Sequence, residues 1–222
     1  MPDWDTHRAS DVDEIERRLV VRGGKIAAKA FSTNFHDLKV LTPFPIPARG
    51  GAILVCNHVS SIDPVLLQSA CPRVITWIMA REYGNIFGTR WFLNAIEPIQ
   101  VERSGRDMAA TRAALRALKD GKIMGLFPEG RIAPGHELLE FQTGVALLAI
   151  KSKAPVYPAY LDGTMRRKGM LEAFGRPNRA TLAFGPAIDL GGQTEGREGL
   201  EAVTRRIRAA VADLAAVGRH HV

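Results

Sequence analysis

A short apolar run followed at once by a histidine constrains the fold of this chain more than any other feature. Residues 52–56 (AILVC) are continuously apolar and are bounded by turn-forming residues, which predicts a buried strand. His58 follows this strand, and Asp63 stands five positions later, in front of Pro64. The histidine and the carboxylate therefore lie where a strand gives way to a helix, a common place for the site of an α/β protein.

His58 and Asp63 allow two interpretations from this stretch alone. In the catalytic one, a neutral imidazole takes a proton from a hydroxyl near pH 7, and a carboxylate on its other nitrogen fixes the tautomer. No serine or cysteine nucleophile is needed if that hydroxyl belongs to the substrate. In the structural one, Asp63 is the N-cap of a helix that starts with Pro64, and His58 is an ordinary loop residue.

The length and charge of the chain narrow the class of protein. Its 222 residues are enough for one domain with a full core. The 30 Lys+Arg against 23 Asp+Glu give a net charge of +7, which favours nucleic acid, an anionic membrane surface or polyanionic substrates such as phosphates and coenzyme A. Nucleic acid is disfavoured, because the sequence contains no recognised binding module and no aromatic-basic platform.

The cysteines and the N-terminus indicate the compartment. The two cysteines are too few for a disulfide framework, and Cys56 falls inside the predicted strand, which fits a reducing, cytosolic setting. No metal is expected, because the sequence has no CxxC, HExxH or His/Cys cluster. The first residues are acidic and lack an apolar core, so we expect no signal peptide, and no run approaches the roughly 18 apolar residues of a membrane span.

The N-terminal part is predicted to be helical. Residues 10–35 carry apolar positions at helical spacing with basic residues between them, and Gly23-Gly24 is expected to break or kink the run. Such a helix suits interfacial binding to a membrane or docking on the protein's own core, and the pattern does not decide between them.

The rest of the chain alternates between strand and helix patterns. Strand patterns occupy residues 73–80, 96–101, 122–127, 155–161 and 181–184, helical patterns residues 107–119, 144–153 and 200–214, and an aromatic-rich helix or loop residues 83–94. This alternation predicts an α/β fold, a layered mixed sheet flanked by helices, with an N-terminal amphipathic helical segment. We expect residues 1–42 to form that possibly membrane-associating segment and residues 43–222 the α/β domain.

Four motifs, in a fixed order, resemble the conserved motifs of a known protein family. They are Asn57-His58 with Asp63, Ala80-Arg81-Glu82-Tyr83 with residues 96–103, Phe127-Pro128-Glu129-Gly130-Arg131, and Ala154-Pro155-Val156-Tyr157-Pro158. Over residues 50 to 165 the chain resembles the glycerolipid acyltransferase family, whose best-known members are the 1-acyl-glycerol-3-phosphate (lysophosphatidate) acyltransferases. The HxxxxD stretch combined with the later FPEGR motif makes this resemblance specific.

The resemblance implies transfer of an acyl group from acyl-coenzyme A or acyl-carrier protein to the hydroxyl of a lysophospholipid. His58 would be the general base and Asp63 would orient it. The absence of a G-x-S-x-G elbow fits direct attack without a covalent enzyme intermediate. We expect a peripheral protein on the inner, cytoplasmic face of an anionic cell membrane, with no nucleic-acid partner.

The FPEGR motif also makes sense as a substrate-binding turn. A Pro and a Gly after a strand give a fixed turn whose backbone can approach a ligand, and the Arg131 fork suits a phosphate. Glu129 would accept bonds from an acceptor hydroxyl or hold Arg131, and a purely structural Glu–Arg pair is the alternative. The full substrate-binding set that the resemblance implies is Arg103, Glu129, Gly130, Arg131 and Arg81.

Departures from the family pattern leave the acceptor open. Arg81 replaces the usual lysine, and Phe141-Gln142-Thr143-Gly144 lacks the cation that the family often has there. The hypothesis that the resemblance implies is acylation of 1-acyl-sn-glycerol-3-phosphate to phosphatidic acid, and the departures support only a different acceptor. The alternatives are the same chemistry on a lyso-amino-lipid, another lysophospholipid or a glycolipid, or a non-catalytic basic membrane-binding module.

Overall fold

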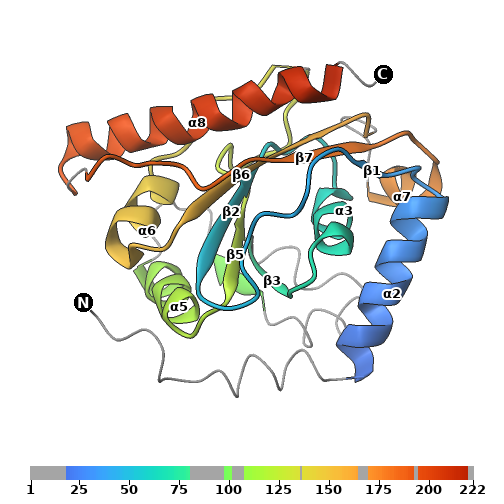
Figure 1. The fold of residues 1–222 in the computed structure, drawn as a ribbon, viewed down its shortest axis with the longest axis horizontal. Coiled ribbons are helices and arrows are strands. Elements are labelled where there is room, and N and C mark those ends of the chain that lie inside the picture. The colour runs from blue at the N-terminus through green and yellow to red at the C-terminus, as the bar shows by residue number, and fades with distance from the viewer. Residues whose placement is uncertain are drawn as a thin grey trace.

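A mixed seven-stranded sheet forms the centre of the described structure (Figure 1). The computed structural model describes residues 19–80, 98–101, 108–135, 137–164, 170–192 and 195–219. In chain order the strands are β1 (Lys39–Val40), β2 (Ala52–Cys56), β3 (Ile75–Ala80), β4 (Ile99–Val101), β5 (Ile123–Leu126), β6 (Val156–Asp162) and β7 (Thr181–Phe184). Their order across the sheet is β1-β7-β6-β2-β5-β3-β4. All neighbours run parallel except β6 and β7, so the predicted mixed sheet is confirmed.

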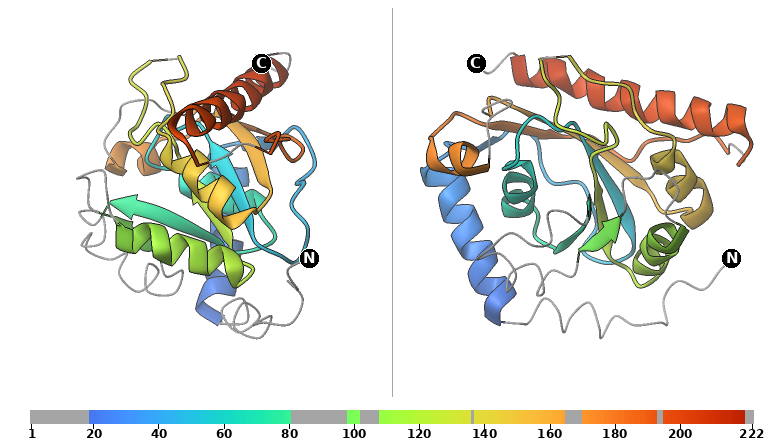
Figure 2. Two further views of the ribbon diagram at one scale, coloured as in Figure 1. Left: turned by 90° about the vertical axis from the view of Figure 1, so that its left-hand side faces the viewer. Right: turned by 180° about the vertical axis from the view of Figure 1, so that it is seen from behind.

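Helices cover both faces of the sheet (Figures 1 and 2). They are α2 (Leu19–Asn34), α3 (Asp63–Ala70), α5 (Met108–Lys119), α6 (Gly144–Ser152), α7 (Met170–Gly175) and α8 (Arg197–Arg219). The core on one face includes residues of α3, and the core on the other includes residues of α5, α6 and α8. Among the described residues, no helix is both long and apolar enough to cross a bilayer.

Strand β2 lies in the middle of this arrangement, and this position explains its continuous apolar sequence. It pairs with β5 on one side and β6 on the other. Leu54 and Cys56 join the core on the α3 face, whereas Ile53 and Val55 join the core on the α8 face. All five residues are buried, as expected for a parallel strand covered on both faces.

Most predicted elements appear within one to three residues of their expected bounds. Strands β2 and β7 match the expected ranges, and the apolar stripe of α8 is buried at Val203, Ile207 and Val211. Two elements were not predicted: β1 has two residues and α7 has six, too few to show a period. The expectations for residues 10–18 and 83–94 lie outside the described residues.

The predicted break at Gly23-Gly24 is wrong, because α2 continues through both glycines. Each interior glycine costs a helix roughly 1 kcal/mol relative to alanine, so tertiary contacts must offset it. Val21 and Ser32 are buried, and the Lys25 Nζ donates to the carbonyl of Pro72 just beyond α3. Packing against α3 therefore sets the course of α2 more than local propensity does.

Candidate active site

The candidate site lies at the carboxyl ends of β2 and β5. These two strands are parallel neighbours, so the segments that follow them emerge at the same edge of the sheet. His58 follows β2 and Glu129 follows β5. The backbone N–H of His58 donates to Glu129 Oε1 at 2.8 Å, and the backbone N–H of Ala133 donates to the carbonyl of His58 at 2.7 Å. The segment after β5 therefore binds both the backbone N–H and the backbone carbonyl of His58.

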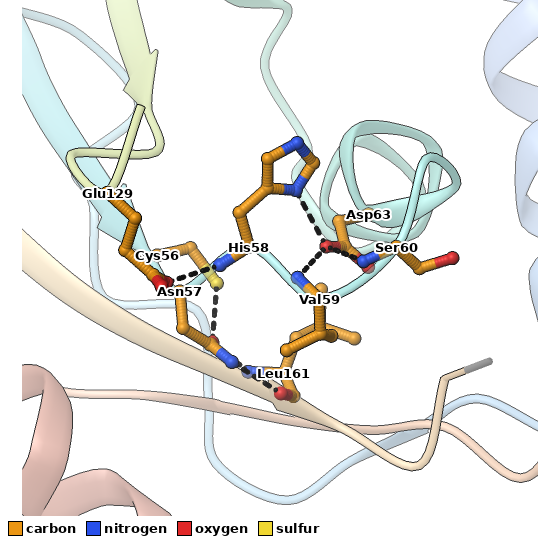
Figure 3. Close-up of polar contacts among 8 residues, drawn as sticks. All are labelled: Cys56, Asn57, His58, Val59, Ser60, Asp63, Glu129 and Leu161. Atoms are coloured by element: carbon orange, nitrogen blue, oxygen red, sulfur yellow. Dashed lines mark hydrogen bonds and ion pairs between the residues drawn. The ribbon is translucent and has the colours of Figure 1, made fainter. Parts of the chain in front are cut away.

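A fully buried carboxylate organises the turn between β2 and α3 (Figure 3). Asp63 Oδ2 lies 2.9 Å from His58 Nδ1 and accepts the backbone N–H groups of Val59 and Ser60 at 2.7 and 2.8 Å. Ile62 takes the N-cap position of α3, which has no side-chain cap, and Asp63 is its first residue. The N-cap alternative for Asp63 is therefore wrong: its carboxylate reaches back into the turn and to the histidine.

These contacts define the proton arrangement of the imidazole. Two backbone N–H groups already donate to Asp63 Oδ2, so that oxygen acts as an acceptor and His58 Nδ1 must supply the proton between them. A neutral ring protonated at Nδ1 carries its lone pair on Nε2, on the far side of the ring from Asp63 (Figure 3). The His58 side chain is 18% exposed and Asp63 is fully buried. The ring thus carries its proton acceptor on the side away from the buried carboxylate.

Asn57 fixes the position from which His58 projects. Its side-chain oxygen accepts the backbone N–H of Leu161, and its side-chain nitrogen donates to the carbonyl of the same residue, both at 2.8 Å. Leu161 belongs to β6, the neighbour of β2 on the side away from β5 (Figure 3). Sequence analysis gave Asn57 no separate role, because nothing near it in the chain indicates a partner so distant in sequence.

Glu129 supports the backbone of the site, a contact that its motif position did not predict. It is buried, with Oε1 bound by the His58 amide and Oε2 by the Leu139 amide at 3.2 Å. Burial raises the pKa of Glu129, and the hydrogen bonds from these two amides only partly offset that effect. Within the described residues, Arg131 is exposed and forms no ion pair with Glu129. The carboxylate therefore supports the backbone of the site, and both the acceptor contact and the Glu–Arg pair remain predictions without a contact to support them.

The Gly130 turn has the tight geometry that the sequence indicated. The amide of Gly130 donates to the carbonyl of Phe127, and its φ of +69° lies in the left-handed region that favours glycine. A Cβ on this residue would lie 2.2 Å from Nε2 of Gln142, so the side chain that approaches the turn is that amide. Gly130, Arg131 and Gln142 are all exposed, and they form one corner of the surface.

The structure describes some of the remaining candidate residues and not others. Arg81 and Arg103 lie outside the described residues. Cys56 is buried behind the site, and burial first, with the nearby Asp63 and Glu129 carboxylates second, raises its pKa well above the usual value. A buried thiol held protonated is a small apolar group and not a nucleophile, which leaves His58 as the reactive side chain at the end of β2.

Replacing Glu129 tests the supporting role. Glu129→Gln exchanges one acceptor oxygen for an NH2 group, so either the His58 or the Leu139 amide loses its partner. We expect a loss of about 1–3 kcal/mol in the free energy of unfolding, measured by urea denaturation. Glu140→Gln is the matched control, because Glu140 is 88% exposed and pairs only at the surface with Arg208. Equal stability of the two variants would contradict the role given to Glu129.

Several known proteins are similar in sequence to this chain. Residues 37–162 match the model of the Acyltransferase family. A 1-acyl-sn-glycerol-3-phosphate acyltransferase of Bacillus subtilis is 27% identical over 139 residues, which cover 61% of this chain and 67% of that protein. The protein of the same name from Helicobacter pylori is 27% identical over 60% of this chain and 58% of its own length. The aligned part of a Borreliella burgdorferi relative spans about half of that protein, 48%.

A solved structure extends the likeness to nearly the whole chain. The crystal structure of the 1-acyl-sn-glycerophosphate acyltransferase PlsC from Thermotoga maritima superposes with a TM-score of 0.69 at 25% sequence identity. The superposition covers 97% of this chain and 84% of that one. The family match spans more than half of the 222 residues and includes the turn with His58 and Asp63 and the FPEGR corner. This chain therefore belongs to the Acyltransferase family.

Proposed function

We propose that this protein transfers a fatty acyl group from an acyl thioester to the free hydroxyl of a lysophospholipid, with 1-acyl-sn-glycerol-3-phosphate as acceptor and phosphatidic acid as product. The observation that carries the proposal is the oriented imidazole: His58 Nδ1 is bound to a buried carboxylate, and Nε2 makes no hydrogen bond with any described residue. The relatives named for this acceptor, from B. subtilis and H. pylori, support the choice of substrate.

The reaction follows from this orientation. His58 Nε2 takes the proton of the acceptor hydroxyl while the oxygen attacks the thioester carbonyl. The tetrahedral intermediate collapses, the carbon–sulfur bond breaks, and the imidazolium returns the proton to the departing thiolate. The products are the ester and the free thiol, with no acyl group on the protein. Asp63 steadies the imidazolium between the two steps and keeps Nδ1 protonated throughout.

The rate enhancement of the proposed reaction has two sources, His58 and the groups that position the substrates. General-base catalysis supplies a factor of roughly 10² to 10⁴, and holding the two substrates in line supplies much of the rest. Arg131, exposed beside the Gly130 turn, is the described side chain suited to hold the acceptor phosphate. Arg81 and Arg103 are proposed for the same role on the motif resemblance.

The residues beside Gly130 also support a second class of acceptor. The residue that covers the turn is Gln142, a neutral amide that donates and accepts hydrogen bonds. An amide suits a headgroup with hydroxyl or amine groups as well as it suits a phosphate. Acylation of another lysophospholipid, a lyso-amino-lipid or a glycolipid is therefore the second candidate function.

An acceptor panel tests the proposed function. The purified protein is given acyl-coenzyme A or acyl-carrier protein, and thiol release is followed with each lyso-acceptor in turn and with none. We expect the highest kcat/KM with 1-acyl-sn-glycerol-3-phosphate. A higher value with another lyso-lipid would replace the acceptor and keep the chemistry. Release that never exceeds the rate without acceptor would leave a basic membrane-binding module as the better account.

Replacing His58 tests its role in the reaction. His58→Ala removes the base while leaving the backbone bonds to Glu129 and Ala133 possible. We expect kcat to fall by at least roughly 10²-fold, with the circular dichroism spectrum and liposome binding unchanged. A variant that folds normally and keeps kcat within about threefold of the native value would mean that His58 is not the base.

We also propose a peripheral position on the inner face of an anionic membrane, and the exposed face of α2 supports the membrane contact. Arg22, Ile26 and Lys29 are spaced four and three residues apart and are all exposed, Ile26 at 71%. Residues at this spacing share one side of a helix. An apolar side chain between two cations is suited to the boundary between lipid headgroups and acyl chains. The opposite side of α2, with Val21 and Ser32, is buried.

A charge reversal on this face tests membrane binding. Lys29→Glu changes the charge by two units beside Ile26, so we expect affinity for vesicles of phosphatidylglycerol and phosphatidylcholine to fall about tenfold and native binding to weaken with salt. Arg205→Glu makes the same charge change at an exposed position of α8, on the other face of the sheet (Figure 1). Equal losses for both variants would show that net charge, and not the face of α2, governs binding.

A further inference from the structure

Two aromatic rings, Phe127 and Trp77, are stacked behind His58, the candidate base. The ring centroids of His58 and Phe127 are 4.1 Å apart with planes 16° from parallel. The rings of Phe127 and Trp77 follow at 5.2 Å and 5°. One face of the imidazole is therefore covered by an aromatic ring whose other neighbour is the indole of a largely buried tryptophan.

The strand order brings these rings together. His58 follows β2, Phe127 follows β5 and Trp77 belongs to β3, and these strands are consecutive neighbours in the sheet. Trp77 pairs in register with Gly125, two residues before Phe127. A Cβ on Gly125 would lie 2.5 Å from the indole, so the tryptophan crosses the space that a side chain at this position would fill. Gly125 thereby lets the indole reach the phenyl ring.

From this geometry we infer that Phe127, supported by Trp77, is a positioning residue that fixes the plane of the His58 imidazole during acyl transfer, an inference that rests on the proposed function. The hydrogen bond to Asp63 holds the ring at one atom and leaves it able to pivot about that contact. A ring stacked on its face removes this freedom, because tilting the imidazole would separate the two surfaces.

The consequence concerns the direction of Nε2. With Nδ1 bound to Asp63 and one face against Phe127, the lone pair of Nε2 points along one line. Proton transfer depends on that line, and displacing a catalytic group by about 1 Å can reduce a rate about 10²-fold. The stack also excludes water from the covered face of the ring.

Turnover measurements test the inference through a split between kcat and KM. Phe127→Leu keeps an apolar side chain and removes the stacked ring, so we expect kcat to fall about 10- to 100-fold while KM changes by less than about threefold. Phe127→Tyr restores a ring of the same shape and should recover kcat to within about threefold of native. Phe44→Leu removes a ring that packs edge-on against Phe184, apart from the stack, and controls for the loss of an aromatic group.

The ring protons of His58 give a second readout that needs no turnover. A phenyl ring at this distance shifts their NMR resonances upfield, and comparison with His58→Ala assigns them. We expect upfield positions in the native protein, Phe127→Tyr and Trp77→Phe, and positions near those of free imidazole in Phe127→Leu. Trp77→Leu should move the resonances partway and lower kcat less than Phe127→Leu does.

Clear outcomes overturn the inference. Native resonances at free-imidazole positions would show that the stack does not exist, even if the acceptor panel finds no substrate and the proposed function fails. With an active protein, Phe127→Leu that loses the upfield shift but keeps native kcat would show that the stack does not position the base. Equal loss of kcat in the Leu and Tyr variants would do the same.

Discussion

One oxygen atom, Oδ2 of Asp63, organises the segment that joins the central strand to α3. It accepts two backbone amides of the turn and contacts the ring of His58, all within 2.9 Å. A buried carboxylate is costly unless hydrogen bonds stabilise it, and here the bonds to Oδ2 come from the segment whose shape the carboxylate controls, whereas Oδ1 forms no hydrogen bond with the described residues. The fold of the turn and the orientation of the imidazole therefore depend on the same group.

The surroundings of this turn hold it from three sides. Asn57, the first residue of the turn, is hydrogen-bonded to β6. Glu129 and Ala133 bind the backbone of His58 from the β5 side. Asp63, the first residue of α3, contacts the ring of His58. In this arrangement Glu129 is part of the support, although its motif position had suggested contact with the acceptor. In the proposed reaction, recognition of the headgroup is assigned to side chains at the exposed corner beside Gly130 and to the arginines that the motifs indicate.

Sequence reasoning succeeded where the determining contacts are local. The five apolar residues of β2 predicted a central strand, and the short spacing from His58 to Asp63 allowed a direct bond across one turn. It did not find contacts between distant segments: Asn57 and Leu161 are 104 residues apart, and His58 and Glu129 are 71. The predicted break at Gly23-Gly24 is wrong for a related reason, because packing on α3 outweighs the helix propensity of two glycines.

The tautomer of His58 is the most direct test of the account. Nitrogen-15 NMR of the native protein at neutral pH distinguishes a protonated ring nitrogen from a bare one, and His58→Ala assigns the signals. We expect a proton on Nδ1, coupled to Asp63, and a bare Nε2 that is ready to accept the proton of an acceptor hydroxyl. A proton on Nε2 with a bare Nδ1 would contradict the assignment of His58 as a base oriented by Asp63.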